Sequence, residues 1–177
     1  MSLHRANAPN PYDYLPPVPP FTVTSEDVRE GVHLTIDHVY SGAGGKNESP
    51  HLSWRGAPEG TRGYAVTCLD PDAPTGSGAW HWLLVNLPAS VTELPRGTGS
   101  WAEPPVGGFH VRNDLGSFGY DGAAPPPGDR PHRYLFVVHA LDTDTLEVTR
   151  ETSAAFVGFH ITGHTIARAT LVPTYQH

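Results

Sequence analysis

The sequence predicts a mostly β protein: an antiparallel β-sandwich with few short helices, one of them near the C-terminus. The chain has 19 glycines and 19 prolines among 177 residues, well above average usage, which indicates many turns. Hydrophobic residues make up 38% of the chain and include four tryptophans, enough for a packed core. The apolar runs are short and follow one another without helical segments between them, which favours an antiparallel sandwich over βαβ units.

The length fits one domain, which buries roughly two-thirds of the surface of its unfolded chain. Residues 1–20 contain six prolines together with Tyr12 and Tyr14, a composition typical of an extended, polyproline-like segment. We therefore expect a proline-rich N-terminal arm over residues 1–20, lying on the domain or on a partner subunit, and a single domain over residues 21–177.

Three strands are predicted in the first third of the chain. Apolar and polar residues alternate over Phe21–Thr24 and Val32–Tyr40, a period typical of half-buried strands. Ser49–Trp54 has the composition of a short strand. Ser41–Asn47 is glycine-rich, but it lacks the GK[ST] ending of a phosphate loop and no helical pattern follows, which favours a surface loop.

Two buried strands flank the most polar loop of the chain. Tyr64–Leu69 is a continuous apolar run that ends at Asp70, because Pro71 and Pro74 cannot donate hydrogen bonds to a sheet. Trp80–Leu87 is the second run. Alternation along it directs one set of side chains to one face, namely His81, Leu83 and Val85, and another to the opposite face, namely Trp80, Trp82, Leu84 and Asn86.

The last third of the chain predicts two strands and one helix. Arg133–Leu141 reads as a strand, and alternation places His132 and Tyr134 on the same face. Ser153–Ala167 has apolar residues at helical spacing behind Ser153, a candidate N-cap. Ala169–Tyr175 is expected to form a short final strand.

Charge and composition exclude several classes of function. The formal net charge is −7 with only 11 lysines and arginines, so no basic surface is predicted for a nucleic acid. No apolar run is long enough for a signal peptide or a membrane span, and we expect a cytoplasmic protein. Cys68 lies within an apolar run and is expected in the core rather than as a nucleophile.

Two loops carry the residues that point to a site. Asp70, Asp72 and His81 lie in the first, and His132 and Tyr134 follow the second, a long Gly/Pro segment. If the loops meet, two imidazoles, a phenol and backbone N–H groups form a donor-rich hollow suited to phosphate, sulfate or carboxylate. Alternatively the aspartates cap turns, His132 caps a strand and Tyr134 belongs to the core.

Two motifs resemble the signature regions of a known family. The stretches DPDAP followed by WHWLLVN, and GYDGAAPPPGDRPHRYLFVVHAL, are similar to those of the phosphatidylethanolamine-binding protein family, in its bacterial Raf-kinase-inhibitor-like branch. The similarity extends from about Phe21 to Tyr175. It implies a β-sandwich with a small anion pocket, whose matching residues here are Asp70, Asp72, His81, Ala124, Pro125, His132 and Tyr134.

The resemblance also implies finer features. Ala123-Ala124 stands where many bacterial relatives have Pro-Cys, so thiol chemistry is absent from that wall. The Ala73–Pro74 peptide bond is expected to be cis, as is typical of the family. Bacterial members are often homodimers, and a homodimer is expected here.

Three functions follow from these residues. The first is a non-enzymatic protein that binds a phosphorylated or anionic small molecule, such as a phospholipid head group; this hypothesis includes the regulation of another protein, which the sequence does not identify. The second is a cofactor-independent isomerase, epimerase or cyclase of secondary metabolism, with Asp70, His81, His132 and Tyr134 as the acid–base set. The third, a metal site, has suitable ligand types, but we assign no metal ligand and expect no cofactor.

Overall fold

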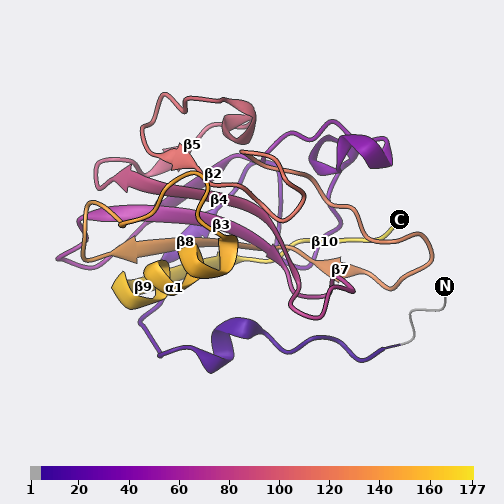
Figure 1. Ribbon diagram of the computed structural model, residues 1–177, viewed down its shortest axis with the longest axis horizontal. Coiled ribbons are helices and arrows are strands. Elements are labelled where there is room, and N and C mark those ends of the chain that lie inside the picture. Colours follow the sequence, from indigo (N-terminus) through magenta and orange to yellow (C-terminus); the bar gives the residue numbers. More distant parts are fainter. Residues whose placement is uncertain (1–4) are drawn as a thin grey trace.

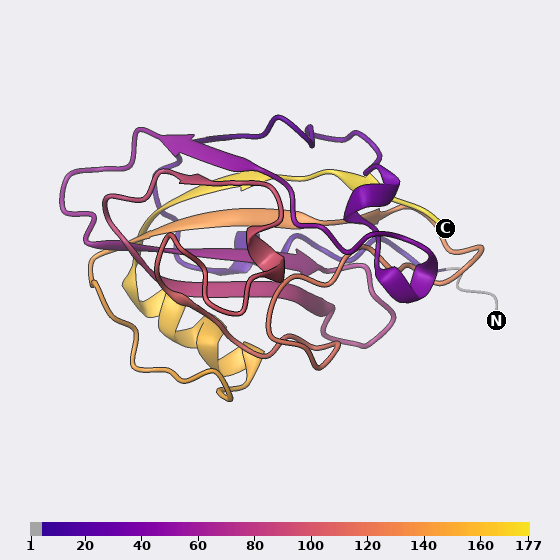
Figure 2. The same cartoon turned by 90° about the horizontal axis from the view of Figure 1, so that it is seen from above.

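The computed structural model describes residues 5–177, and its centre is an antiparallel sheet of five strands in the order β6-β4-β3-β8-β9. Their bounds are Phe109–His110 (β6), Ala79–Pro88 (β4), Gly63–Asp70 (β3), Leu135–Leu141 (β8) and Thr165–Leu171 (β9). β3 and β8 are buried along their whole length, as their continuous apolar sequences require. Figure 2 shows the yellow β9 and the orange β8 running side by side.

A second sheet covers one face of the first. It consists of Thr22–Thr24 (β1), Leu52–Arg55 (β2) and Glu93–Leu94 (β5) in the order β1-β2-β5. Side chains of the two sheets, including Leu52, Trp54, Val66 and Leu84, share the larger hydrophobic core. In Figure 1 this small sheet lies above the five strands, and the predicted mostly β sandwich is confirmed.

The opposite face of the large sheet carries the helix α1 (Ala154–His164), the one α-helix within residues 5–177. Ala154, Val157 and Ile161 of this helix pack on Leu83 and Val85 of β4 in a second core. Ser153 precedes the helix as predicted, but its side chain makes no capping hydrogen bond. The helix ends at His164, and the strand that follows begins at Thr165 rather than at the predicted Ala169.

The predicted strand over Val32–Tyr40 is wrong. The segment instead contains a short 3-10 helix, Ile36–His38 (η2), with Ile36 half exposed. Its buried residues are Leu34, His38 and Val39. Isolated bridges connect His33 to Thr174 and Val39 to Ala123, and the segment joins no sheet as a strand. Three further 3-10 turns are Pro11–Tyr14 (η1), Ser41–Ala43 (η3) and Thr98–Ser100 (η4).

A β-bulge in β4 changes which faces its first residues point to. Cys68 pairs with Trp82 and Leu69 pairs with Trp80, so His81 has no partner in β3. One extra residue inverts the alternation beyond it. Trp80 therefore packs on the face of Leu83 and Val85 instead of with Trp82. The predicted facing of Trp80 and His81 is thus wrong.

Residues 5–20 lie along the same face of the large sheet as α1, at the bottom of Figure 1. The ring of Tyr12 lies 4.7 Å from the Arg168 guanidinium. Backbone hydrogen bonds join Pro19 and Phe21 to Arg168 of β9. A groove of about 330 Å³ separates this arm from α1. Whether the arm and residues 21–177 are separate units stays a prediction.

No helix within the described residues 5–177 combines the length and the apolar character that crossing a membrane requires.

Candidate functional site

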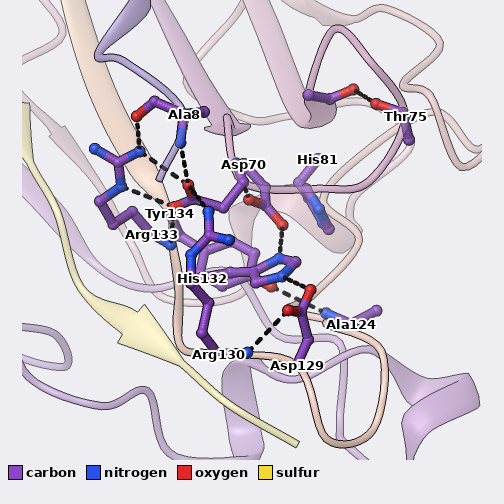
Figure 3. Close-up of polar contacts among 12 residues, drawn as sticks. Ala8, Asp70, Thr75, His81, Ala124, Asp129, Arg130, His132, Arg133 and Tyr134 are labelled. Atoms are coloured by element: carbon purple, nitrogen blue, oxygen red, sulfur yellow. Dashed lines mark hydrogen bonds and ion pairs between the residues drawn. The ribbon is translucent and has the colours of Figure 1, made fainter. Parts of the chain in front are cut away.

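Asp70, the last residue of β3, is the centre of a buried polar cluster (Figure 3). Its Oδ2 accepts a hydrogen bond from Nδ1 of His132 at 2.7 Å. Its Oδ1 accepts one from the backbone N–H of Asp72 at 2.8 Å. Asp70 therefore holds both the turn that follows its strand and the histidine from the second loop.

His132 starts the short strand β7 (His132–Arg133), which pairs with β10 (Thr174–Tyr175). Its Nε2 donates to Oδ2 of Asp129 at 2.8 Å. Since both ring nitrogens face carboxylate oxygens, both carry hydrogen and the ring is an imidazolium. Burial by itself lowers the pKa of His132, but Asp70 and Asp129 raise it more, so that it lies above its usual value. His132 is therefore a buried cation.

Asp72 is fully occupied by protein donors. It accepts from Arg133 Nε at 2.7 Å, Arg130 Nη2 at 2.8 Å and the backbone N–H of Ala8 at 3.2 Å. Burial tends to raise the pKa of Asp72, but the two guanidinium groups lower it to about 2. With its lone pairs used in this way, Asp72 anchors the arm and two arginines.

The bulge at His81 turns its ring toward Tyr134, and the two ring centroids are 5.3 Å apart in an edge-on arrangement. Nδ1 of His81 donates to the carbonyl oxygens of Asp121 at 2.8 Å and Gly122 at 3.1 Å. This fixes the neutral tautomer with its lone pair on Nε2. Burial lowers the pKa of His81 more than these carbonyls and Asp70 raise it. The ring is therefore neutral, and the described residues provide no hydrogen bond to its Nε2.

Tyr134 lies between β7 and β8, where the chain passes from the small pair of strands into the large sheet. Its backbone N–H donates to the carbonyl oxygen of Pro173 at 2.9 Å. Its hydroxyl oxygen accepts from the backbone N–H of Ala124 at 3.3 Å. Burial raises the pKa of Tyr134, so the hydroxyl keeps its hydrogen and is able to donate it.

The loop that aims the two carbonyls at His81 is held by amide side chains. Asn113 Nδ2 donates to the Asp121 carboxylate at 2.8 Å, and Asn47 Nδ2 donates to it at 3.0 Å. Asn47 Oδ1 also accepts from the N–H of Gly122 at 2.7 Å. A side chain at Gly122 would collide with the backbone of Val39. This position therefore requires glycine.

The structure separates the remaining predicted site residues. Ala124 and Pro125 line a hollow of about 440 Å³ together with Tyr40 and His177. Asp72 instead lines a cavity of about 680 Å³ beneath the arm. The structure brings together four of the predicted residues, namely Asp70, His81, His132 and Tyr134. The charge of the Asp70 carboxylate acts on the side chains of the other three.

The expected cis bond is wrong: the described chain contains no cis peptide bond, so Ala73–Pro74 is trans. Within residues 5–177, no group of three or more His, Cys, Asp or Glu side chains is arranged to hold a metal ion.

Sequence reasoning missed several members of this cluster, namely Arg5, Asn47, Asn113, Asp121, Asp129, Arg130 and Arg133. Asp129 and Arg130 lie directly before Pro131-His132, within the second motif. Ionisable residues that close to a candidate histidine are a signal that was available. Arg5 and Asn47 are far away in sequence, and nothing local connects them with the site.

Comparison with known proteins agrees with the resemblance of the two motifs. The family profile described as phosphatidylethanolamine-binding protein matches residues 24–176. The UPF0098 protein YbcL of Escherichia coli strain K12 is 49% identical over 160 residues, covering 88% of this chain and 87% of YbcL. The UPF0098 protein YbhB of the same strain is 49% identical over 155 residues, covering 86% of this chain and 98% of YbhB.

The fold comparison gives the same result. The crystal structure of E. coli YbcL, described as a new member of the mammalian PEBP family, matches with a TM-score of 0.86 and 48% identity. The match covers 89% of this chain and 98% of that one. Family profile, sequence relatives and fold agree, and the chain belongs to the phosphatidylethanolamine-binding protein family.

Proposed function

We propose that this protein binds a small molecule with a phosphate or other anionic group at its cluster of His81, His132 and Tyr134. Membership of the family supports ligand binding in general. The observation that carries the proposal is the pair His81 and Tyr134: their rings meet edge-on at 5.3 Å, and each keeps one hydrogen-bonding position unused by the described residues.

Formal charges around this pair are balanced. The cluster has four carboxylates, those of Asp70, Asp72, Asp121 and Asp129. It also has four cationic groups, those of Arg5, Arg130, His132 and Arg133. An anionic ligand therefore meets no net negative charge, in a site where burial reduces screening by water.

The unused hydrogen-bonding positions of Tyr134 and His81 favour a phosphate that keeps one proton. The Tyr134 hydroxyl has a hydrogen to donate to a phosphoryl oxygen. Neutral His81 presents a lone pair at Nε2, which accepts a hydrogen bond from a P–OH group. Asp70 orients His132, while the backbone N–H of Ala124 holds the hydroxyl oxygen of Tyr134.

A phospholipid head group is one source of such a phosphate. Its ammonium group would need an unoccupied acceptor, but the oxygens of Asp70 and Asp72 accept hydrogen bonds from protein donors. Recognition is therefore proposed to act on the phosphate, whether it belongs to a lipid or to a soluble phosphomonoester.

The acid–base alternative has less support. His132 uses both ring nitrogens on carboxylates, which leaves it no position for proton exchange with a substrate.

A homodimeric state and a cytoplasmic location stay predictions. Size-exclusion chromatography with light scattering tests the first of them.

Calorimetric titration with O-phosphoethanolamine and with inorganic phosphate at pH 6 tests the proposal. Tyr134→Phe removes one hydroxyl and His81→Gln removes the ring, and each is expected to weaken binding at least tenfold. Tyr64→Phe is the matched control, because Tyr64 is a buried tyrosine that packs on Trp54. Equal affinities for the wild type and Tyr134→Phe, with both proteins folded by thermal melting, would refute the proposed site.

A further inference from the structure

The segment Arg5–Ala8 of the arm is held at the site through its backbone. The N–H of Ala8 donates to Asp72 Oδ1 at 3.2 Å, and the carbonyl oxygen of Ala8 accepts from Arg133 Nη2 at 2.6 Å. The carbonyl oxygen of Arg5 accepts from Arg130 Nη1 at 3.3 Å. These bonds do not depend on the side chains of the arm, so they fix the path of the chain and leave its side chains free for another role.

The side chain placed by this path is that of Arg5. Its Nη1 donates to Asp129 Oδ2 at 2.8 Å, and its Nη2 donates to the carbonyl oxygen of Asp72. The side chain is 29% exposed, whereas that of Asp129 is 1% exposed. Two of the five N–H groups of the guanidinium are used in these bonds, and three remain for a ligand.

Arg5 and His132 converge on a single oxygen. Oδ2 of Asp129 accepts from His132 Nε2 and from Arg5 Nη1, both at 2.8 Å. Nη2 of Arg5 lies only 3.5 Å from Nε2 of His132. Two cations at this separation repel each other. The shared oxygen of Asp129 offsets both, and Asp70 offsets His132 from its other side. A further anion beside them relieves the repulsion.

We infer that Arg5 is a ligand-binding residue of the anion site and that it determines the preference of the site for phosphate. This inference rests on the proposed function. Without Arg5, the four carboxylates of Asp70, Asp72, Asp121 and Asp129 outnumber the three cations of Arg130, His132 and Arg133. Arg5 therefore removes a net negative charge that would repel an anion, and its planar guanidinium suits the paired oxygens of a phosphate.

The arm has a second consequence for the choice of ligand. The cavity of about 680 Å³ beneath it is lined by the charged residues Arg5, Asp72 and Arg130, and by Pro9, Pro11 and Leu69 among its apolar residues. A bound phosphate that contacts Arg5 therefore has space for an organic substituent next to it, and phosphomonoesters are favoured over small carboxylates such as acetate.

The test uses the full-length chain and calorimetric titration with inorganic phosphate, O-phosphoethanolamine and acetate. Arg5→Gln removes the charge and keeps a hydrogen-bonding side chain. It is expected to weaken binding of both phosphates about tenfold and to reduce the dependence of affinity on salt concentration. Arg5→Lys is expected to restore part of the affinity. Arg55→Gln, at the exposed end of β2, is the control for a general change in charge.

Each outcome decides between the inference and the function on which it rests. If Tyr134→Phe and His81→Gln weaken binding but Arg5→Gln does not, the inference about Arg5 is wrong and the proposed function stands. Tighter binding by Arg5→Gln would show that the arm blocks the site, which also overturns the inference. If the wild type binds neither phosphate, or if only Arg5→Gln has an effect, the proposed site at His81 and Tyr134 fails as well.

Discussion

Oδ2 of Asp70 lies 2.7 Å from Nδ1 of His132 and joins two loops that are 62 residues apart in sequence. Asp70 ends β3, at the centre of the large sheet, while His132 begins β7 and leads into the neighbouring strand β8. Because β3 and β8 are paired antiparallel, the end of one lies beside the start of the other. The sheet therefore creates the contact, and the contact holds a charged histidine at the end of the sandwich.

The charge on His132 should appear in the pH dependence of stability. The pKa of His132 is raised in the folded protein, because Asp70 and Asp129 outweigh the effect of burial. A raised folded pKa contributes stability that is complete below the unfolded value of about 6.5 and is lost as pH rises through the folded value. We expect the difference in unfolding free energy between the wild type and His132→Gln to be largest near pH 6 and to shrink at higher pH.

Denaturant titrations of both proteins between pH 6 and 9 measure this difference. Asp70→Asn serves as the control, because it removes one of the two carboxylates and should shift the loss of stability toward lower pH. A difference that is the same across the whole range would mean that folding does not raise the pKa of His132.

The neutral state of His81 leads to a prediction about ligands. Since burial lowers its pKa and its Nδ1 is bound to two carbonyls, Nε2 is an acceptor. It should select a phosphate that still carries a proton, and the second pKa of a phosphomonoester is about 6. We expect the affinity for O-phosphoethanolamine to fall as pH rises from 5.5 to 8.

Sulfate is the matched control, because it has the shape of phosphate and no proton to donate at these pH values. Calorimetry at pH 6 should give an affinity for sulfate at least tenfold lower than that for inorganic phosphate. Equal affinities for the two ions would show that Nε2 of His81 carries a hydrogen in the complex.

The sequence predicts most of the fold and part of the site for identifiable physical reasons. Continuous apolar runs correspond to β3, β4 and β8, since strands buried on both faces must be apolar. The alternation argument fails at Trp80 and His81, where a bulge adds one residue. Whether a strand bulges depends on its partner, and no local pattern records it.

The same limit applies to the roles of the acidic residues. Asp70 and Asp72 are equivalent in the sequence motif, yet Asp70 orients His132 and Asp72 is occupied by Arg130 and Arg133. Arg5 reaches the site from a position 127 residues before His132. Such a long-range contact depends on the path of the arm across the folded sheet, which composition alone does not determine.

Gly122 should not tolerate a side chain. A Cβ at this position would overlap the carbonyl carbon of Val39 and the backbone nitrogen of Tyr40. We expect Gly122→Ala to lower the free energy of unfolding by about 1–3 kcal/mol, the usual cost of overpacking. It should also weaken phosphate binding, because the carbonyl of Gly122 helps to orient His81.

Gly163→Ala is the control for this substitution. Gly163 lies in α1 with no atom near the position of an added Cβ. Alanine there should stabilise the protein by up to about 1 kcal/mol, the difference in helix propensity. Thermal and denaturant unfolding distinguish the two variants, and equal stabilities for Gly122→Ala and the wild type would mean that the loop moves away from Val39.

The fixed position of the arm should depend on the negative charge of Asp72. Asp72→Asn leaves Arg130 and Arg133 without their carboxylate partner and weakens the bond from the N–H of Ala8. Removing one partner of a buried ion pair costs about 3–5 kcal/mol, and since both arginines keep some exposure we expect the lower end of that range. Hydrogen exchange of the Ala8 amide should become faster, while Asp13→Asn, at an exposed position in the arm, should leave it unchanged.

Because the guanidinium groups lower the folded pKa of Asp72 to about 2, the contribution of Asp72 to stability is present above pH 4 and is lost as pH falls toward 2. Fast exchange of the Ala8 amide in the wild type at pH 6 would show that Asp72 and Arg133 do not hold the arm, and Arg5 would then lose its fixed place beside His132.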